Sequence, residues 1–199
     1  AGAKIEALRG RLASLHAAAA RPGDARIYPG HYAPVIVVDD GRRVVKPMRY
    51  QCRPAGKPAS FDRRFPGTYN ARRDSLDGFW KPLFGVSHGL LVVHAFYENV
   101  ARDGANVVLE FRPRPAHPML VACLWSRWQG AGEPDLLSFA AITDEPPPEV
   151  AAAGHDRCIV PIKPEHIDAW LSPRPATPQA LQALLDDRDR PYYEHRLAA

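Results

Sequence analysis

Two ionisable side chains in the middle and late parts of the sequence could exchange protons if the fold brings them together. Glu98 follows an apolar run that begins at Leu90, and His155 lies in the segment Gly154-His155-Asp156-Arg157. A carboxylate beside an imidazole can give a proton to a substrate and take it back near neutral pH. Because a carboxylate at the end of a buried strand is costly unless it is solvated, paired or protonated, we expect Glu98 at a mouth facing water or in a functional site.

A basic segment precedes these residues. Between positions 41 and 81 the acidic residues are only Asp62, Asp74 and Asp77, whereas the basic ones are Arg42, Arg43, Lys46, Arg49, Arg53, Lys57, Arg63, Arg64, Arg72, Arg73 and Lys81. The same segment carries the aromatic residues Tyr50, Phe61, Phe65 and Tyr69. Cations that follow phosphates and rings that stack on bases suit single-stranded nucleic acid. The alternatives are a solvated surface for the charges and, for each ring, an anchor to the core.

Composition narrows the class of protein. With 199 residues and 46% apolar content, the chain is long enough for one globular domain with a sizeable core. Cys52, Cys123 and Cys158 are odd in number and form no CxxC motif, which argues against a disulfide framework and a structural zinc site. No signal peptide is visible, and no apolar stretch approaches the roughly 20 residues of a membrane span. These features fit a reducing compartment without membrane contact, metal or cofactor, and we expect a cytoplasmic, nucleoid-associated protein.

Other candidate side chains have simpler interpretations. His88 and His94 show no metal-ligand pattern. His94 would alternate in phase with Phe96 and Glu98 in one regular strand, and we expect a core histidine there. Cys158 lies three residues after His155, but residues i and i+3 of a strand point to opposite faces. We therefore expect Cys158 in the core and not beside the histidine as a nucleophile.

Short segments with alternating patterns must position these residues. A hairpin is predicted at 34–38 and 44–48, irregular chain at 49–70, and further strands at 90–100, 106–111, 119–125, 137–143 and 158–162. Helices are predicted at 3–20, 74–84, 164–171 and 179–187. This order predicts an α+β fold with a mainly antiparallel, barrel-like sheet and peripheral helices. We expect a single domain over 1–199, with its core at about 27–171 and a helical C-terminal tail at 178–199.

Four motifs occur in a defined order along this framework. They are Asn70-Ala71-Arg72, Phe96-Tyr97-Glu98, Leu124-Trp125 and His155-Asp156-Arg157. In order and spacing they resemble the SOS-response-associated peptidase (SRAP) family of abasic-site-processing proteins. That family shows Asn-Ala-Arg, then Gly-Phe-Tyr-Glu at a strand end, then a Leu-Trp strand, then His-Asp-Arg-Met-Pro. The resemblance covers residues 27–171 and implies the SRAP-like fold.

The sequence departs from the family pattern at several positions. The segment Arg49-Tyr50-Gln51-Cys52 stands where Trp-Gly-Leu is usual. Ala95 replaces the glycine before Phe-Tyr-Glu, Asn99 replaces the tryptophan after it, and Cys158 replaces the methionine after His-Asp-Arg. The family nucleophile is a cysteine directly after the initiator methionine, whereas position 2 here is Gly2. These departures indicate a divergent branch, and we expect the segment that carries the cysteine to lie upstream of Ala1.

The resemblance implies recognition of abasic sites in single-stranded DNA. It also implies a thiazolidine crosslink to an N-terminal cysteine that is absent from this chain, and autoproteolytic removal of the initiator methionine. The implied catalytic residues are Glu98, His155 and Asn70, and the DNA-binding candidates are Arg72, Arg73, Arg157, Arg53 and Tyr50. The alternatives are a non-catalytic module that binds single-stranded or gapped DNA, and a hydrolase built on Glu98 and His155. We expect a monomer.

Overall fold

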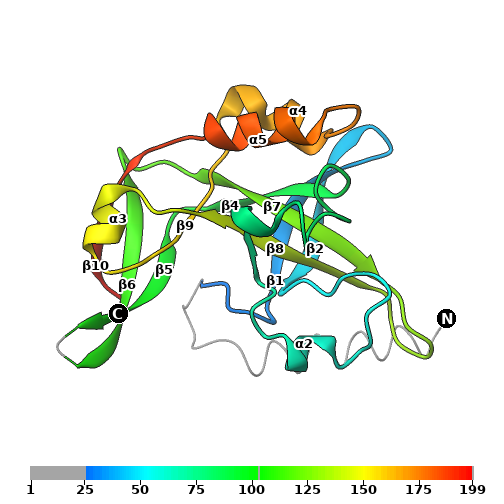
Figure 1. Ribbon diagram of the computed structural model, residues 1–199, viewed down its shortest axis with the longest axis horizontal. Helices are drawn as coiled ribbons and strands as arrows, with labels where there is room; N and C mark the ends of the chain where they lie inside the picture. Colours follow the sequence, from blue (N-terminus) through cyan, green and yellow to red (C-terminus); the bar gives the residue numbers. More distant parts are fainter. Residues whose placement is uncertain (1–25, 103, 199) are drawn as a thin grey trace.

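The strands form two β-sheets, and the short helices lie outside them (Figure 1). The computed structural model describes residues 26–102 and 104–198, so the helix predicted at 3–20 lies outside the described residues. The larger sheet forms the centre of the molecule, and the smaller sheet lies to one side of it, at the left in Figure 1. The candidate site residues are distributed over both sheets, so their arrangement determines the site.

Five strands of the larger sheet close into a barrel. They are β1 (Tyr32–Asp39), β2 (Arg42–Tyr50), β4 (His88–Val93), β7 (Met119–Trp128) and β8 (Leu136–Asp144). The order is β2-β1-β4-β7-β8, and the ring closes because β8 also pairs with β2, through Ser138 and Phe139. The turn between β1 and β2 uses Asp40 and Gly41, both at positive φ. The prediction of an α+β fold with a barrel-like sheet is confirmed.

Two short strands extend the barrel beside the end of β8. In the parallel pairing of β3 (Asn70–Arg72), Asn70 lies opposite Ala141. In the antiparallel pairing of β9 (Cys158–Ile159), Ile159 lies opposite Thr143. The next residue, Val160, is inserted between β7 and β8: its N–H donates to Ile142 and its carbonyl accepts from Ala122. Asn70 and the segment that follows His155 therefore reach the same end of the barrel.

The second sheet has the order β10-β6-β5. Its strands are β5 (Phe96–Arg102), β6 (Ala105–Arg114) and β10 (Tyr192–Leu197). The single strand predicted at 90–100 is wrong: the chain leaves the barrel after Val93, and regular pairing stops at His94 and Ala95. His94 is exposed at this break, so it is not the core histidine that strict alternation predicted.

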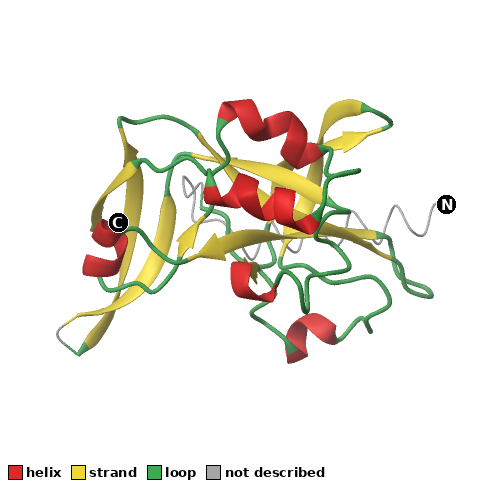
Figure 2. Ribbon diagram, turned by 45° about the horizontal axis from the view of Figure 1, so that its top comes forward, coloured by secondary structure: helices red, strands yellow, loops and turns green. Residues whose placement is uncertain are grey.

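The short helices lie around the barrel and beside the smaller sheet (Figure 2). They are α2 (Phe61–Arg64), α3 (Pro148–Ala152), α4 (Ile167–Leu171) and α5 (Pro178–Asp186), with 3-10 turns η1 (Arg73–Ser75) and η2 (Pro164–His166). The helices predicted at 164–171 and 179–187 are confirmed. The helix predicted at 74–84 is wrong, because Gly78 and Pro82 divide this segment into successive turns. The C-terminal tail at 178–199, predicted to be helical, also contains strand β10. The pairing of β10 with β6 outweighs any local preference of this segment for a helix.

Buried side chains form two hydrophobic clusters on either side of the barrel wall. The first joins the barrel to the small sheet through Phe96, Phe111 and Tyr193. The second packs Trp170 of α4 and Leu181 of α5 against the outside of the barrel. The first cluster therefore fixes the position of β5 relative to the barrel, and with it the position of Glu98.

Candidate functional site

Glu98 and His155 meet across the junction between the two sheets. In β5 the side chains of Phe96, Glu98 and Val100 share one face, and Phe96 and Val100 are buried in the core. Glu98 is therefore placed at the edge of an apolar environment. Its Oε2 lies 3.1 Å from Nε2 of His155, and the two side chains are 24% and 15% exposed. Glu98 and His155 therefore lie within hydrogen-bonding reach of each other, although His155 is not among the residues that line the cavity beside Glu98.

The hydrogen bonds of His155 define where its protons lie. Nδ1 is 2.8 Å from the carbonyl oxygen of Arg157. Because a carbonyl oxygen only accepts, Nδ1 carries a proton, and the 3.3 Å contact from the Arg157 N–H to the same nitrogen is secondary. The hydrogen bond between Nε2 and Glu98 then requires one further proton, on either the imidazole or the carboxyl group. The pair therefore shares a proton that it can give to a substrate.

The environment of Glu98 favours its protonated form. Burial raises the pKa of its carboxyl group above the ordinary value, while the positive charges of His155 and Arg157 act in the opposite direction and only partly cancel the effect. A carboxyl group with a raised pKa keeps a transferable proton closer to neutral pH. Such a group can act as a general acid and then as a general base.

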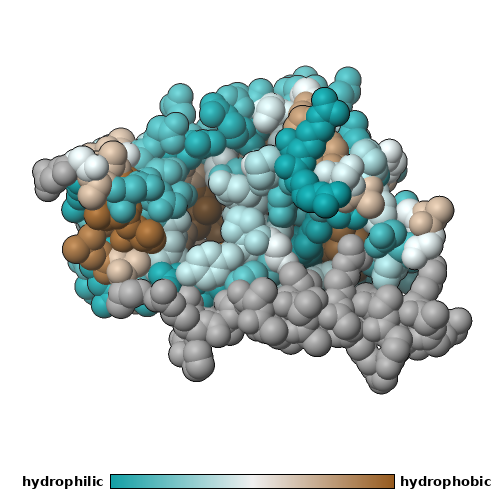
Figure 3. Space-filling model, turned by 90° about the horizontal axis from the view of Figure 1, so that it is seen from below, coloured by the Kyte–Doolittle hydropathy of each residue, from teal (hydrophilic) through white to brown (hydrophobic). Residues whose placement is uncertain are grey.

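A cavity of about 420 Å³ opens beside Glu98. Asn70 and Glu98 both line it, and its remaining wall is largely apolar and aromatic: Ile27, Tyr28, Pro29, Tyr50, Tyr69, Leu91, Val93, Phe96, Tyr97, Val108, Val121, Ala141 and Ile159 belong to it. The view from below shows a hollow with an apolar floor (Figure 3). Polar groups that converge in an apolar concave pocket are typical of a small-molecule or nucleotide site.

Tyr50 forms part of the wall of this cavity. Its ring stacks on Phe139 at 5.1 Å and meets Tyr69 edge-on at 5.7 Å. Burial, and secondly the nearby Glu98 carboxylate, raise the pKa of the Tyr50 phenol. The phenol therefore stays neutral, and one face of the ring is already occupied by a protein side chain.

Arg72 and Arg157, which form what we call the rim, each lie two residues after a site residue, Asn70 and His155, and their side chains are 52% and 34% exposed. Arg72 pairs with Asp74 at 2.6 Å, and Arg157 contacts Asp156 at 3.3 Å. The Arg72 guanidinium lowers the pKa of Asp74, and the Arg157 charge contributes to this shift. Both retain exposed N–H groups, which can hold a phosphate in bidentate fashion.

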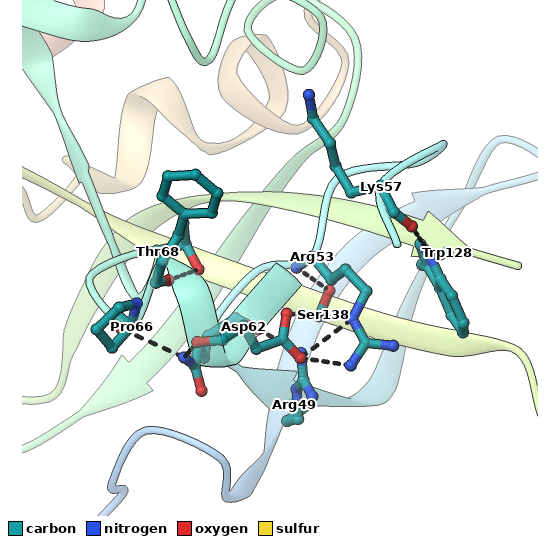
Figure 4. A network of polar contacts seen from close by, with 10 residues as sticks. Arg49, Arg53, Lys57, Asp62, Pro66, Thr68, Trp128 and Ser138 are labelled. Atoms are coloured by element: carbon teal, nitrogen blue, oxygen red, sulfur yellow. Dashed lines mark hydrogen bonds and ion pairs between the residues drawn. The ribbon is translucent and has the colours of Figure 1, made fainter. Parts of the chain in front are cut away.

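Arg53 and Arg73 have different surroundings. The Arg53 side chain is 4% exposed, binds Asp62 and lies 4.4 Å from the centre of the Trp128 ring. Figure 4 shows Arg49 and Arg53 converging on Asp62 beneath the loop that precedes β3. Arg73 binds three partners on other elements, namely Asp144, Asp186 and Gln182. These two guanidiniums hold segments together, which argues against the DNA contacts expected for Arg53 and Arg73.

Sequence reasoning missed one cluster at the cavity. The guanidinium of Arg26 lies 5.6 Å from the ring centre of Tyr28 and 5.3 Å from that of Tyr97. All three residues line the cavity. No spacing in the sequence signals this contact, because residues 26 and 97 meet only when β5 packs beside the barrel.

The cysteines are all buried and unlinked. Burial raises the pKa of the Cys52 and Cys158 thiols to about 12, and that of Cys123 also rises. The expectation that Cys158 belongs to the core is confirmed, since it is 3% exposed. A thiol that stays protonated is a weak nucleophile. These three side chains therefore offer no reactive thiolate.

A larger cavity, of about 730 Å³, lies on the other side of Ile159. Two of its arginines, Arg73 and Arg188, both bind Asp144. In the described ranges, 26–102 and 104–198, no group of three or more His, Cys, Asp or Glu side chains is placed to hold a metal ion. None of the helices described is long and apolar enough to cross a membrane.

Known proteins share both the pattern and the fold. The model of the family described as SOS response associated peptidase (SRAP) matches residues 3–197. No curated protein matches the chain significantly. A solved protein from Bordetella bronchiseptica superposes with a TM-score of 0.72 at 19% identity over 90% of both chains.

Two further solved structures have a similar fold. A protein from Bacteroides thetaiotaomicron superposes with a TM-score of 0.71 at 14% identity, over 85% of this chain and 75% of the other. A phage-related protein from Bordetella bronchiseptica gives 0.65 at 20% identity, over 86% and 80%. At these identities the structural likeness supports the fold, and the family model covers nearly the whole sequence. The chain therefore belongs to the SOS response associated peptidase (SRAP) family.

Proposed function

We propose that this protein recognises abasic sites in single-stranded DNA and that its pocket promotes their covalent capture by an N-terminal cysteine. Family membership supports the broader role, which is binding of abasic sites in the response to DNA damage. The observation that carries the finer proposal is the Glu98–His155 pair, with Glu98 on the wall of the 420 Å³ cavity. A shared proton beside an apolar cavity is suited to the chemistry of an aldehyde.

The cavity has features that suit a sugar without a base. An abasic site exists partly as a ring-opened aldehyde. This sugar carries no base, so the cavity needs no room for one. Asn70 offers an amide that can donate to a sugar oxygen and accept from a hydroxyl. Tyr50, Tyr69 and Phe96 give the cavity an apolar wall against which the carbon skeleton of the sugar can pack. In this proposal Asn70 positions the sugar, and Glu98 and His155 move its protons.

Exposed cations and rings outside the cavity can hold the flanking strand. Arg72 and Arg157 at the rim would bind phosphates next to the lesion. Phe65 and Phe79 are exposed, and the Arg64 guanidinium lies 5.5 Å from the Phe65 ring centre. Phe61, which is buried, packs 4.7 Å from Phe65 and supports it from behind. Rings of this kind stack on unpaired bases without regard to sequence.

The proposed capture reaction needs only the amine and the thiol of an N-terminal cysteine and the aldehyde of the abasic site. Its amine adds to the aldehyde carbon to form a C–N bond, and the oxygen leaves as water after protonation, giving an imine. The thiol sulfur then adds to the imine carbon, and the thiol proton ends on nitrogen, which closes a thiazolidine ring. We assign to His155 the proton transfers at the sugar oxygen, and to Glu98 those nearest the amine. Autoproteolytic exposure of the cysteine belongs to the same proposal.

The second candidate is a binding module without covalent chemistry. It is favoured by the burial and raised thiol pKa values of Cys52, Cys123 and Cys158. None of these internal cysteines has a free amine on the adjacent carbon, so none can close a thiazolidine. Residues 1–199 alone should therefore bind abasic DNA without forming a heat-stable product.

The test compares abasic and intact single-stranded oligonucleotides of equal length. We expect the chain to bind the abasic strand more tightly, and Asn70→Ala and Glu98→Gln to reduce this preference about tenfold. Glu165→Gln, which removes an exposed carboxylate outside the site, is the matched control. In the covalent arm, a version with cysteine at its processed N-terminus should give a crosslink on a denaturing gel, and Glu98→Gln should slow it.

Two results would contradict the proposal. Equal binding of the abasic and intact strands by the unaltered chain would remove lesion recognition. A heat-stable crosslink from the chain that starts at Ala1 would show that the nucleophile is an internal cysteine or a lysine. A version with the N-terminal cysteine that recognises the lesion but never crosslinks would leave the binding module as the function.

A further inference from the structure

The outer face of the small sheet has an unusual distribution of charge. Alternation along the strands places Tyr97 of β5 and Glu110 of β6 on this face, together with Arg112 and Arg196. Glu110 is opposite Tyr97 on one side and opposite Arg196 on the other. Cross-strand neighbours of this kind are close enough for their side chains to interact directly.

Glu110 is shared by two arginines. Its carboxylate is 5% exposed and accepts from Arg112 Nε at 2.7 Å and from Arg196 Nε at 2.6 Å. The Tyr97 hydroxyl donates to it at 3.2 Å. Hydrogen bonds from the Arg196 and Arg112 guanidiniums lower the pKa of Glu110, so it is ionised at neutral pH. One negative charge therefore faces two positive charges, which leaves this cluster with a surplus positive charge.

The surplus charge faces solvent. The side chains of Arg112 and Arg196 are 50% and 70% exposed, although their Nε atoms are fixed by Glu110. A guanidinium has five N–H donors, so each retains outward N–H groups after binding the carboxylate. The shared carboxylate holds the two guanidiniums side by side on adjacent strands. This arrangement is suited to the non-bridging oxygens of a phosphodiester chain.

This face is continuous with the proposed lesion pocket. Tyr97, Asn99 and Val108 belong to the outer face of the sheet, and all three also line the 420 Å³ cavity. Tyr97 thus touches the Glu110 cluster through its hydroxyl group and the cavity through its ring. The ring also carries the Arg26 guanidinium at 5.3 Å. Cationic and aromatic groups therefore run from the pocket onto the sheet without a break.

We propose that the outer face of β5, β6 and β10, through Arg112 and Arg196, is a second phosphate-binding track for the single-stranded DNA that enters the pocket. The proposal rests on the function proposed above, because it takes the lesion strand as its ligand. The track is distinct from the rim that carries Arg72 and Arg157. A strand held at both would cross the pocket with contacts on each side of the lesion, and Tyr97 would provide a stacking surface between them.

The test variant removes the track without leaving a buried charge. The triple change Glu110→Gln, Arg112→Gln and Arg196→Gln lowers the net charge by one and leaves an amide in place of the carboxylate. Arg42→Gln at the tip of the β1–β2 hairpin has the same change in net charge and is the control. Arg112→Gln alone is the milder variant if the triple change lowers the melting temperature strongly.

Binding is measured with abasic oligonucleotides of about 5 and about 15 nucleotides, lengths that bracket a typical single-strand site. For the longer strand we expect the triple variant to bind about tenfold more weakly, and its slope of log Kd against log salt to fall by about 1.4, as for two lost phosphate contacts. Arg112→Gln should lower the slope by about half as much. Binding of the shorter strand should stay within twofold of the unaltered protein.

The outcomes separate the two proposals. If the triple variant and Arg112→Gln match Arg42→Gln on the longer strand, while Arg72→Gln and Asn70→Ala still weaken binding, the track does not exist and the lesion pocket stands. Equal losses on short and long strands would also overturn the track, because they would show damage to the pocket itself. If no variant alters abasic binding, the proposed function is the one that fails.

Discussion

The Glu98–His155 pair is organised by one carbonyl oxygen. Because the Arg157 carbonyl accepts from Nδ1 of His155, the other ring nitrogen is directed at Glu98, 3.1 Å away. Burial raises the pKa of Glu98, and the imidazolium charge restrains that rise. The charge of His155 therefore influences the proton affinity of Glu98, and a change at position 155 should alter the titration of this carboxyl group.

The coupling predicts the titration of a variant. In His155→Gln the positive charge that stabilises the Glu98 carboxylate is lost while the burial remains, so we expect the pKa of Glu98 to rise further. The carboxyl carbon of Glu98 in isotopically labelled protein can be followed by NMR as pH is varied. A lower pKa in the variant would show that the His155 charge does not stabilise the Glu98 carboxylate. Arg157→Gln, which also removes a favourable charge, should shift the pKa in the same direction.

At the scale of the element, the segment after β2 is held in a costly conformation. Gln51 has φ +100°, a region in which residues other than glycine are strained. Its amide donates to the carbonyls of Asp62 and Pro66, and its own carbonyl accepts from Arg49. The residue thus connects the end of β2, where Tyr50 faces the cavity, to the loop that carries Phe65. We infer that strain here is offset by hydrogen bonds that fix the loop.

Two substitutions separate these effects. Gln51→Ala keeps the unfavourable φ and loses the side-chain hydrogen bonds, whereas Gln51→Gly loses the same bonds but relieves the strain. We expect the glycine variant to be more stable than the alanine variant by about 1–2 kcal/mol, within the usual cost of such backbone strain. Urea unfolding of the two variants measures the difference. An alanine variant as stable as the glycine variant would mean that the backbone is not strained at this residue.

The elements also show where sequence reasoning succeeds and where it fails. The hairpin and the barrel strands could be predicted because apolar alternation is a local signal, and the convergence of Glu98 with His155 is implied by the resemblance to the SRAP motifs. The break at His94 and Ala95 could not, since the run from Leu90 to Val100 is apolar enough for one strand and only packing divides it between sheets. The partners of Arg53 could not be predicted either, because Asp62 and Trp128 approach it through tertiary folding.

On the scale of the whole molecule, one histidine joins the barrel to the helical layer. His88 at the start of β4 is 2% exposed, accepts from the Gly85 N–H at 2.8 Å and donates to the Trp170 carbonyl at 3.0 Å. Its ring packs 4.0 Å from that of Trp170. Both ring nitrogens are thus used by the neutral form. Burial lowers the pKa of His88 to about 4, since protonation would place a charge in the core and break the bond from Gly85.

This histidine predicts acid sensitivity of the fold. Because the folded protein lowers the pKa of His88, the unfolded chain binds the proton first as pH falls. The free energy of unfolding therefore decreases as pH falls from 6.5, the pKa in the unfolded chain, to about 4, the pKa in the folded protein. The shift corresponds to about 3 kcal/mol at its limit. We expect the free energy of unfolding of His88→Gln to fall less steeply than that of the unaltered protein across this interval. Parallel pH profiles for the two proteins would contradict the assignment.

The position of β10 in the small sheet has a consequence for biosynthesis. This strand pairs with β6, its Tyr193 packs on Phe96 of β5, and its Arg196 completes the Glu110 cluster. It is nevertheless translated after all the other described strands. A nascent chain that has already exposed the barrel therefore still lacks the support that aligns Glu98. Under the proposed function, Glu98 and His155 emerge from the ribosome before the strand that supports β5, so we expect proton transfer at the site to begin only once β10 has been translated and paired with β6.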